Sequence, residues 1–518
     1  MALFRQKLTK TGHFHHMHQY DVVIIGSGLG GLACGTLFAK EGYKVCVLER
    51  NKQVGGNLQT FVRDRVIFDS GVHYVGGLEN GQTLFKLFKY LGIMEKLKLQ
   101  KMDEDMVDGI MFKGDPKVYR YAQGYDRFIN NLVADFPEEE KAIRRYCEEI
   151  KNVCAKFPLY NLRLGEGVEK NEVLGIDTQL FLESITDNKK LQSVLAGTNV
   201  LYAGEAYKTP LYVHALVTNS YIESSYRFIN GGSQIAILLT KEILQRGGEV
   251  RKRKHVVKLV EEEGELKYAE CADGERFYGK RFISNIHPVK TLEMTRSELI
   301  KKAYRNRIKS LDNSISVFSL NIVMKKDTFK YRNHNIYFYG NNDVWSGVHY
   351  KPGDWPPGWA LFFSTSPRQN GYADGITLMT YMHYKEVKQW ENTFNTAAEE
   401  SDRGSDYERF KKEKAEKLLA EAEVIFPGLT ENIQSYYVAT PLTVRDYIGS
   451  DDGSLYGIAK DYRNPLKTFI SPRTKIPNLL LTGQNLNLHG VMGVAMSAVV
   501  TCSEIFGIEY LLNKIRNA

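Results

Sequence analysis

A glycine-rich turn near the amino terminus constrains the fold of this chain more than any other feature of its sequence. The run 20–25 is mostly β-branched and leads directly into the glycine-rich segment 26–31. A helical pattern follows as far as Gly42, and a second strand-like run, 44–48, ends at the acidic residue Glu49. This order, within about 30 residues, predicts a strand, a tight turn, a helix and a second strand of a dinucleotide-binding βαβ unit.

The glycines and the acid of this unit have the spacing that a dinucleotide requires. Gly26 allows the tight turn, Gly28 lets the backbone approach a pyrophosphate, and Gly31 lets the helix pack closely on the strand. Gly30 lies with them at the helix start, where free N–H groups favour a phosphate. Glu49 follows 18 residues after Gly31, where its carboxylate can accept hydrogen bonds from ribose hydroxyls. We therefore expect all five residues to bind the dinucleotide.

A second loop and the segment after it narrow the choice of cofactor. A glycine pair follows the acid closely, and the segment FDSGVHY occupies 68–74. The run 20–77 resembles the opening of flavoproteins with two dinucleotide-binding domains. The FDSGVHY segment is similar to the phytoene desaturase, carotenoid isomerase and retinol saturase branch, including bacterial retinol-saturase-like proteins. The resemblance implies FAD as the cofactor, in contact with Arg50, Gly55, Gly56 and Asn57.

Two later stretches resemble further parts of the same flavoproteins. In the middle of the chain, the residue matching Val256 or Val257 would reach the adenine through its backbone. Near the carboxyl end, a short strand enters a turn, and a helix rich in small residues opens where its dipole would favour negative charge on a reduced flavin. Many relatives carry an acid where this chain has an amide, so no catalytic role is assigned to that amide. The residues expected at the cofactor here are Gly483, Gln484, Gly490, Val491 and Gly493.

The remaining pattern predicts a second domain of a different kind. Residues 315–385 alternate between apolar and polar side chains, as in a mostly antiparallel sheet with one buried face. We therefore expect an α/β fold with a discontinuous Rossmann-like FAD-binding domain and an α+β substrate domain, as in flavin amine oxidases and phytoene desaturase-like proteins. The FAD-binding domain is expected to comprise 20–90, 225–300 and 466–518, and the substrate-binding domain 91–224 and 301–465, after a disordered leader, 1–19.

Single elements can also be predicted from their periodicity. Two helices are expected within 125–160, one strand at 250–260, a charged helix at 405–424 and one buried helix at 491–512. The apolar, aromatic segment 190–222 has two interpretations, as ordinary core or as the wall of a lipid-shaped cavity.

Composition excludes several classes of protein. The 69 basic and 61 acidic side chains give a net charge of +8, a mild excess that does not indicate a nucleic-acid binder. Six cysteines form no CxxC pair, so we expect neither a disulfide framework nor a zinc site, and reduced thiols suit a cytoplasmic protein. No metal cofactor is expected. The leader histidines are either a metal-binding tract or part of a disordered segment: His13, His15, His16 and His18.

The relation to membranes follows from hydropathy and charge together. No run of 18 uninterrupted apolar residues predicts a membrane span. A lipid substrate would partition into membranes, and the net positive charge permits contact with an anionic surface. We therefore expect peripheral membrane association.

Candidate proton donors lie beside the expected flavin loops. Flavin would supply the redox chemistry, whereas the protein must handle protons. His73 and Tyr74 are the preferred catalytic pair, because they follow the second flavin loop. His287 and His489 are alternatives at other predicted strand or helix ends. Arg445 and Asp446 either shape the pocket or form an ordinary ion pair.

The resemblance favours a saturase that acts on carbon–carbon double bonds of a hydrophobic polyene or isoprenoid lipid, like a retinol 13,14-reductase. A carotenoid or phytoene desaturase and a redox-neutral polyene cis–trans isomerase are alternatives. A flavin-containing lipid carrier without turnover is an alternative of another class, and an amine oxidase is more distant. The sequence has no second glycine-rich fingerprint with strand context. Electrons are therefore expected from transiently bound NAD(P)H or from a partner protein.

Overall fold

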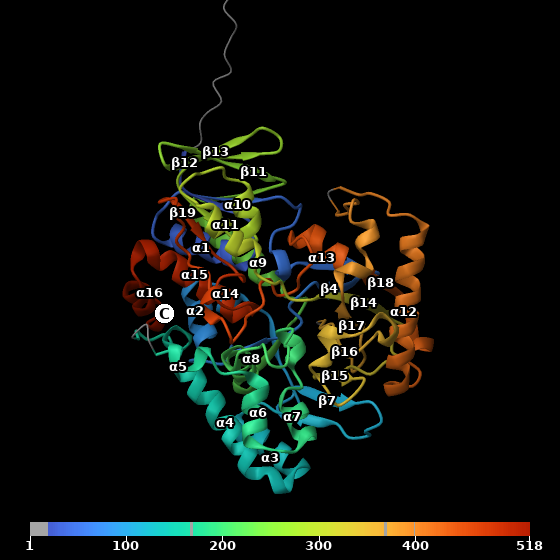
Figure 1. Ribbon diagram of the computed structural model, residues 1–518. Coiled ribbons are helices and arrows are strands. Elements are labelled where there is room, and N and C mark those ends of the chain that lie inside the picture. Colours follow the sequence, from blue (N-terminus) through green and yellow to red (C-terminus); the bar gives the residue numbers. More distant parts are fainter. Residues whose placement is uncertain (1–18, 166–168, 367–369, 398) are drawn as a thin grey trace, which may run out of the picture.

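The computed structural model of the chain describes residues 19–165, 169–366, 370–397 and 399–518 (Figure 1). The leader histidines lie outside these residues, so both of their interpretations stay predictions. Residue 19, assigned to the leader, instead begins the first strand. The predicted βαβ unit is confirmed as β1 (Gln19–Ile25), α1 (Leu29–Lys40) and β2 (Val45–Glu49).

A seven-stranded sheet contains β1 and β2 at its centre. The strand order is β10-β2-β1-β13-β12-β11, and β19 pairs with β13. The pairs β10–β2, β2–β1, β1–β13 and β13–β19 are parallel, whereas β11, β12 and β13 form an antiparallel meander. The strands come from three distant segments of the chain: β10 (Glu249–Lys252), β11 (Val256–Glu262), β12 (Glu265–Cys271), β13 (Arg276–Ser284) and β19 (Leu479–Leu481).

The single strand expected at 250–260 is wrong, because the chain crosses from one edge of the sheet to the other within it. β10 pairs with β2 at the parallel edge, and β11 belongs to the meander. Between them Arg253 has a φ of 59°, and the Lys254 amide donates to the Glu49 carbonyl oxygen. The turn falls within the basic run 251–255 and separates the two strands.

Helices cover both faces of this sheet. One face carries α1 packed between α9 (Ser233–Gln245) and α15 (Gly490–Phe506), with α2 (Thr83–Tyr90) and α16 (Ile508–Arg516) beside them. The single helix expected at 491–512 is therefore two helices, separated at Gly507, whose φ is 82°. The other face carries α10 (Pro288–Glu293) and α11 (Lys302–Lys309). Among the described residues, no helix is long and apolar enough to cross a membrane.

A second seven-stranded sheet forms the other half of the molecule and has the order β18-β14-β17-β16-β15-β7-β8. Neighbouring strands are antiparallel except β7 and β15, which run parallel. The predicted, mostly antiparallel sheet is thus confirmed. Its strands are β7 (Asp108–Phe112), β8 (Tyr119–Tyr121), β14 (Ser316–Met324), β15 (Asn335–Tyr339), β16 (Gly358–Phe363), β17 (Gly375–Met382) and β18 (Ile433–Ala439).

Two groups of helices flank this sheet. The long helix α12 (Ser405–Ile425) lies on one side, and the two helices expected within 125–160 extend away at the bottom of Figure 1. The buried helix α8 shares one apolar core with the sheet, so the segment 190–222 is largely ordinary core. The helices of these groups are α3 (Tyr125–Asp135), α4 (Glu140–Ala155), α5 (Asn171–Leu174), α6 (Thr178–Ile185), α7 (Lys189–Leu195), α8 (Leu211–Glu223) and α13 (Pro441–Ile448). The short helix α14 (Pro465–Thr468) precedes β19 in the chain.

Two small sheets connect the halves. β3 (Thr60–Arg63) pairs with β4 (Val66–Asp69), and β9 (Ser225–Phe228) lies between β5 (Val75–Gly76) and β6 (Leu99–Lys101). Through β5 and β9, the segment that follows the second glycine loop enters the interior beside the second sheet. This path determines where His73 and Tyr74 lie.

Candidate functional site

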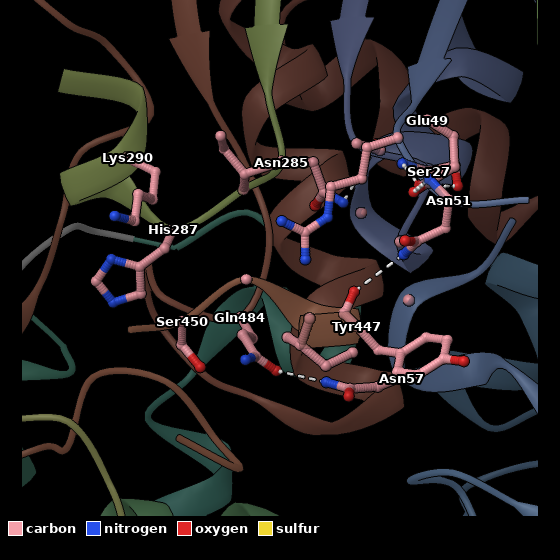
Figure 2. Close-up of a pocket in the computed structure, with 18 of the residues that line it drawn as sticks. Ser27, Glu49, Asn51, Asn57, Asn285, His287, Lys290, Tyr447, Ser450 and Gln484 are labelled. Atoms are coloured by element: carbon pink, nitrogen blue, oxygen red, sulfur yellow. Dashed lines mark hydrogen bonds between the residues drawn. The ribbon is translucent and has the colours of Figure 1, made fainter. Parts of the chain in front are cut away.

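A cavity of about 650 Å³ lies beyond the carboxyl ends of β1, β2, β13 and β19. This is the edge at which doubly wound sheets bind their ligands. Segments far apart in the sequence meet there, and Figure 2 shows them on opposite sides of the space. The wall includes residues of 25–30, 48–51, 55–58, 254–257, 285–287, 445–451, 484–485 and 490–494.

Two helix amino termini open onto this cavity. Gly28 precedes α1 and His489 precedes α15, and no described side chain caps either helix or places an acid in its first turn. Gly30 of α1 and Gly490 of α15 line the wall. Uncapped N–H groups and the positive end of the helix dipole favour an anion or an electron-rich group. The cavity therefore has two separate places for negative charge.

Close backbone contacts explain the glycines of the first two loops. A Cβ at Gly31 would lie 2.1 Å from the Gly26 carbonyl oxygen, so only glycine allows this approach of helix and strand. A Cβ at Gly56 would lie 3.3 Å from the Gly28 Cα. Gly55 has a φ of 117°, and its amide donates to the Ser27 carbonyl oxygen at 3.0 Å. The second loop thus packs directly on the first.

Glu49 is the buried acid at the end of β2. Its Oε2 accepts from the Ser27 amide at 3.1 Å and from the Ser27 hydroxyl at 2.5 Å, while its Oε1 accepts from the Asn51 amide at 2.8 Å. The carboxylate is 6% exposed as part of the cavity wall (Figure 2). Because a carboxylate has about four acceptor positions, it can still accept from a ligand hydroxyl.

Residues of α13 close the same side of the cavity. Arg50 Nη2 donates to the Asp446 carbonyl oxygen at 2.6 Å, and Asn51 Nδ2 donates to the Tyr447 carbonyl oxygen at 3.0 Å. The Asp446 carboxylate pairs with Arg445, with an N–O distance of 2.7 Å. Both Arg445 and Asp446 line the wall, so the ion pair and the pocket-shaping role expected for these residues occur together.

Asn285 is a wall residue that sequence reasoning did not single out. It directly follows β13, and its side-chain amide lies against Gly28, Gly30 and Gly483. The ends of β1, β13 and β19 are therefore held around one side chain. Its position at the carboxyl end of a central parallel strand is the signal that could have identified it. Nearby, Asn57 Nδ2 donates to Gln484 Oε1 at 3.4 Å (Figure 2).

Most residues predicted to bind the cofactor lie together in this wall. Three do not line it and instead pack closely on neighbouring residues behind it: Gly31, Gly483 and Gly493. The residues brought together at the cavity are Gly26, Gly28, Gly30, Glu49, Arg50, Gly55, Gly56, Asn57, Val256, Val257, Gln484, Gly490 and Val491. Their contacts with a cofactor stay predictions.

His73 and Tyr74 lie behind the wall. Gly71 and Val72 line the cavity, after which the chain turns inward. The His73 ring stacks on Phe362 with centroids 4.3 Å apart. Burial, assisted by the charge of Arg227, lowers the pKa of His73 to about 3, so its imidazole is neutral at physiological pH.

The other two candidate histidines are both hydrogen-bonded. His287 lines the cavity, and its Nδ1 accepts from the Val289 amide at 3.3 Å as the cap of α10. His489 Nε2 donates to the Leu201 carbonyl oxygen at 3.1 Å, and burial lowers its pKa to about 4. Neither carries a proton as a cation at neutral pH.

The described residues offer no metal centre. Within 19–165, 169–366, 370–397 and 399–518, no group of three or more histidine, cysteine, aspartate or glutamate side chains could hold an ion. All six cysteines are free and buried.

Known proteins resemble this chain in sequence over short and long stretches. Residues 24–91 match the model of the NAD(P)-binding Rossmann-like domain. The chain is 26% identical to all-trans-retinol 13,14-reductase of Danio rerio, over 94% of this chain and 85% of that protein. It is 24% identical to the chloroplastic prolycopene isomerase of Daucus carota, over 94% of this chain and 80% of that protein.

A solved structure supports the fold independently. Wild-type putrescine oxidase aligns with a TM-score of 0.60 and 14% identity, over 95% of this chain and 99% of that one. The predicted Rossmann-like domain with a second, mostly antiparallel sheet is therefore confirmed. The chain is a homologue of the all-trans-retinol 13,14-reductases and prolycopene isomerases, built on the fold of the flavin amine oxidases.

Proposed function

We propose that this chain is an FAD-dependent oxidoreductase that saturates a carbon–carbon double bond of a hydrophobic polyene or isoprenoid lipid. The observation that carries the proposal is the pair of uncapped helix amino termini, α1 and α15, on one cavity beside Glu49. Homology to retinol reductases over nearly the whole chain supports the reaction class.

The residues present fit an FAD molecule. Glu49 would accept from the ribose, the start of α1 would bind the pyrophosphate, and the start of α15 would lie at the flavin ring. Val256 and Val257 line the wall on the side expected for the adenine. A bound flavin would supply the two-electron chemistry, drawn from NAD(P)H or a partner protein. The chain itself would orient the substrate, exclude water and supply a proton.

An aromatic region beside the cavity supports a flat, apolar substrate. Tyr456 lines the cavity and packs on His489 with ring centroids 4.5 Å apart. Tyr381 is 6% exposed, and its hydroxyl has no hydrogen-bond partner among the described residues. Tyr221 packs on Tyr74 with ring centroids 4.4 Å apart and the ring planes tilted by 33°. Large aromatic surfaces between the cavity and the second sheet suit a conjugated chain.

Anaerobic absorption spectroscopy tests this function. The flavin-loaded protein is reduced chemically and mixed with a panel of retinoids and carotenoids. We expect one polyene to restore the oxidised flavin bands and to gain two hydrogens by mass. A protein sample lacking flavin is the control and should leave each polyene unchanged.

Other outcomes of this experiment select other functions. Persistent reduced flavin with a shifted polyene spectrum and unchanged mass indicates isomerisation, which the prolycopene isomerase homologues favour. A parallel anaerobic sample that keeps the flavin oxidised tests the desaturase, for which a polyene should bleach the oxidised flavin bands. A separate aerobic assay with amines tests the amine oxidase, which would produce peroxide only when an amine is present. If no substrate changes either spectrum, the saturase proposal is contradicted and the lipid carrier gains support.

We further propose that the protein docks peripherally on anionic membranes through the surface around α14. Leu466 is 73% exposed between Arg463 and Lys467. Lys170 lies 5.1 Å from the ring of Phe469, which directly follows α14. Exposed apolar and basic side chains together favour an anionic lipid surface.

Vesicle flotation tests this surface. We expect the wild type to float with phosphatidylserine vesicles at low salt, and Leu466→Asp to lose most of this binding. Val424→Asp is the matched control, because Val424 is equally apolar and 75% exposed but lies on α12. Absence of wild-type flotation, or equal flotation of Leu466→Asp, contradicts the proposal.

A further inference from the structure

A chain of buried polar side chains extends from Tyr74 into the second half of the molecule. The Tyr74 hydroxyl lies 3.1 Å from Asp108 Oδ2 and 2.7 Å from the Tyr337 hydroxyl. Asn335 Nδ2 donates to Asp108 Oδ1 at 2.8 Å, and Arg227 Nη2 donates to Asn335 Oδ1 at 2.8 Å. None of the five is more than 4% exposed. We call these five residues the Asp108 network.

The topology of the second sheet assembles this network. β7 and β15 are neighbours in the second sheet (Figure 1). Their parallel pairing places Asp108 directly opposite Asn335, and Tyr337 follows two residues later on the same strand face. Arg227 reaches Asn335 from β9 and also donates to the Phe363 carbonyl oxygen at 3.0 Å. The register of β7 and β15 therefore fixes the positions of Asp108, Asn335 and Tyr337, and no flexible loop is involved.

Asp108 can change its charge near neutral pH. Burial raises the pKa of Asp108 to about 7, although the hydrogen bonds from Asn335 and Tyr74 and the charge of Arg227 act in the opposite direction. The Arg227 guanidinium stays protonated. Burial raises the pKa of every tyrosine that faces Asp108 above its ordinary value: Tyr74, Tyr121, Tyr221, Tyr337 and Tyr339.

Protonation of Asp108 reverses the direction of the hydrogen bonds. When Asp108 is ionised, Tyr74 donates to it and Tyr337 donates to Tyr74. When Asp108 is protonated, it can donate to Tyr74, Tyr74 then donates to Tyr337, and the Tyr337 proton is released from this chain. Among the described residues, the hydrogen-bond partner of the Tyr337 hydroxyl is Tyr74.

The Tyr337 end of the network is fully buried behind the cavity wall, on the side of Tyr456. Tyr337 lies within electrostatic range of Tyr221 and Tyr456, and Tyr456 lines the cavity beside the start of α15. The opposite end of the network is Arg227, whose guanidinium does not release a proton. A proton moving along this network can therefore leave it at Tyr337.

We propose that the Asp108 network supplies the proton for double-bond reduction, with Asp108 as the reservoir, Tyr74 as the intermediate and Tyr337 as the group that protonates substrate carbon. The proposal rests on the proposed function. The Tyr337 O–H bond breaks as a C–H bond forms, the Tyr74 proton moves to Tyr337, and the Asp108 proton moves to Tyr74. The second hydrogen and both electrons come from the reduced flavin, itself reduced by NAD(P)H or a protein donor. Asp108 later regains a proton from water.

Infrared spectroscopy of the flavin-loaded protein tests the reservoir without turnover. In the wild type we expect a carbonyl band of a protonated carboxylic acid that disappears as the pH rises through about 7. Asp108→Asn, which preserves the side-chain shape, should lack this band. Asp69→Asn is the matched control, because burial also raises the pKa of Asp69 to about 7, but this carboxylate accepts from the Gly232 amide outside the network. It should remove a different band and keep that of Asp108.

Stopped-flow reoxidation by a polyene tests the relay. In the wild type the rate should fall as the pH rises above about 7, because Asp108 then loses its proton. In Asp108→Asn the rate should be about 10² to 10⁴-fold lower and should lack this pH dependence. Tyr337→Phe should show a similar loss while keeping the Asp108 band.

Tyr339→Phe provides the matched control on the same strand. The Tyr339 hydroxyl is buried and bonds the Gly197 carbonyl oxygen and Asn199, so its removal should leave both rate and pH profile near those of the wild type. Wild-type kinetics in Asp108→Asn, or no infrared band that depends on Asp108, would overturn the proposal. A wild type that no polyene reoxidises contradicts the proposed function itself, an outcome distinct from failure of the relay alone.

Discussion

Gly31→Ala is expected to lower FAD affinity by at least about 100-fold, because flavin binding depends on backbone positions that the added methyl group displaces. The new Cβ would lie 2.1 Å from the Gly26 carbonyl oxygen and 3.3 Å from the Asn285 side chain. The first contact is with backbone, so it is relieved only if α1 moves away from β1. Such a shift withdraws N–H groups from the phosphates, and hydrogen bonds to charged groups contribute about 1.5–3 kcal/mol each.

This effect is measured by calorimetric titration of the apoprotein with FAD, with circular dichroism to confirm folding. Gly175→Ala is the matched control, since a Cβ at Gly175 meets no atom within 4 Å and its φ is −94°. The control should bind FAD like the wild type. Equal affinity of Gly31→Ala and wild type would show that this close approach does not determine binding, and would weaken the assignment of the first loop to the pyrophosphate.

The first glycine loop could be predicted from the sequence, whereas the Asp108 network could not. The elements β1, α1 and β2 follow from short-range periodicity, glycine placement and one acid within about 30 residues. Their geometry is local, so the pattern predicts both the fold and the site. The cavity residues from the middle and the end of the chain could be anticipated only through resemblance to flavoproteins.

Residues that act through distant partners have no such local signature. Tyr74 and Tyr337 are 263 positions apart, and Asn335 meets Asp108 because β7 runs parallel to β15 in an otherwise antiparallel sheet. Alternation of side chains predicts strands but not which strands become neighbours. His73 and Tyr74 were expected at the cavity because they follow the second flavin loop in the sequence. In the structure the chain turns inward directly after Val72, so neither side chain lines the cavity.

Asp446→Ala is expected to destabilise the fold by about 3–5 kcal/mol, because it leaves two buried cations without their counterion. Asp446 is fully buried, and its carboxylate pairs with Arg403 and with Arg445 and accepts from the Asn395 amide at 2.9 Å. The side chains of the two arginines are only 5% and 14% exposed. Water therefore cannot compensate for the lost carboxylate.

The measurement is urea denaturation of the apoprotein, because FAD bound to the folded state would add its own stabilisation and mask part of the loss. Asp406→Ala is the matched control, since Asp406 forms an ion pair with Arg409 on the surface of α12, where both side chains are more than 60% exposed. Exposed pairs contribute about 0–1 kcal/mol, so the control should lose less than about 1 kcal/mol. If Asp446→Ala loses no more than Asp406→Ala, then α13 does not depend on this ion cluster. The Arg50 contact to the Asp446 backbone would then need another explanation for its position at the cavity.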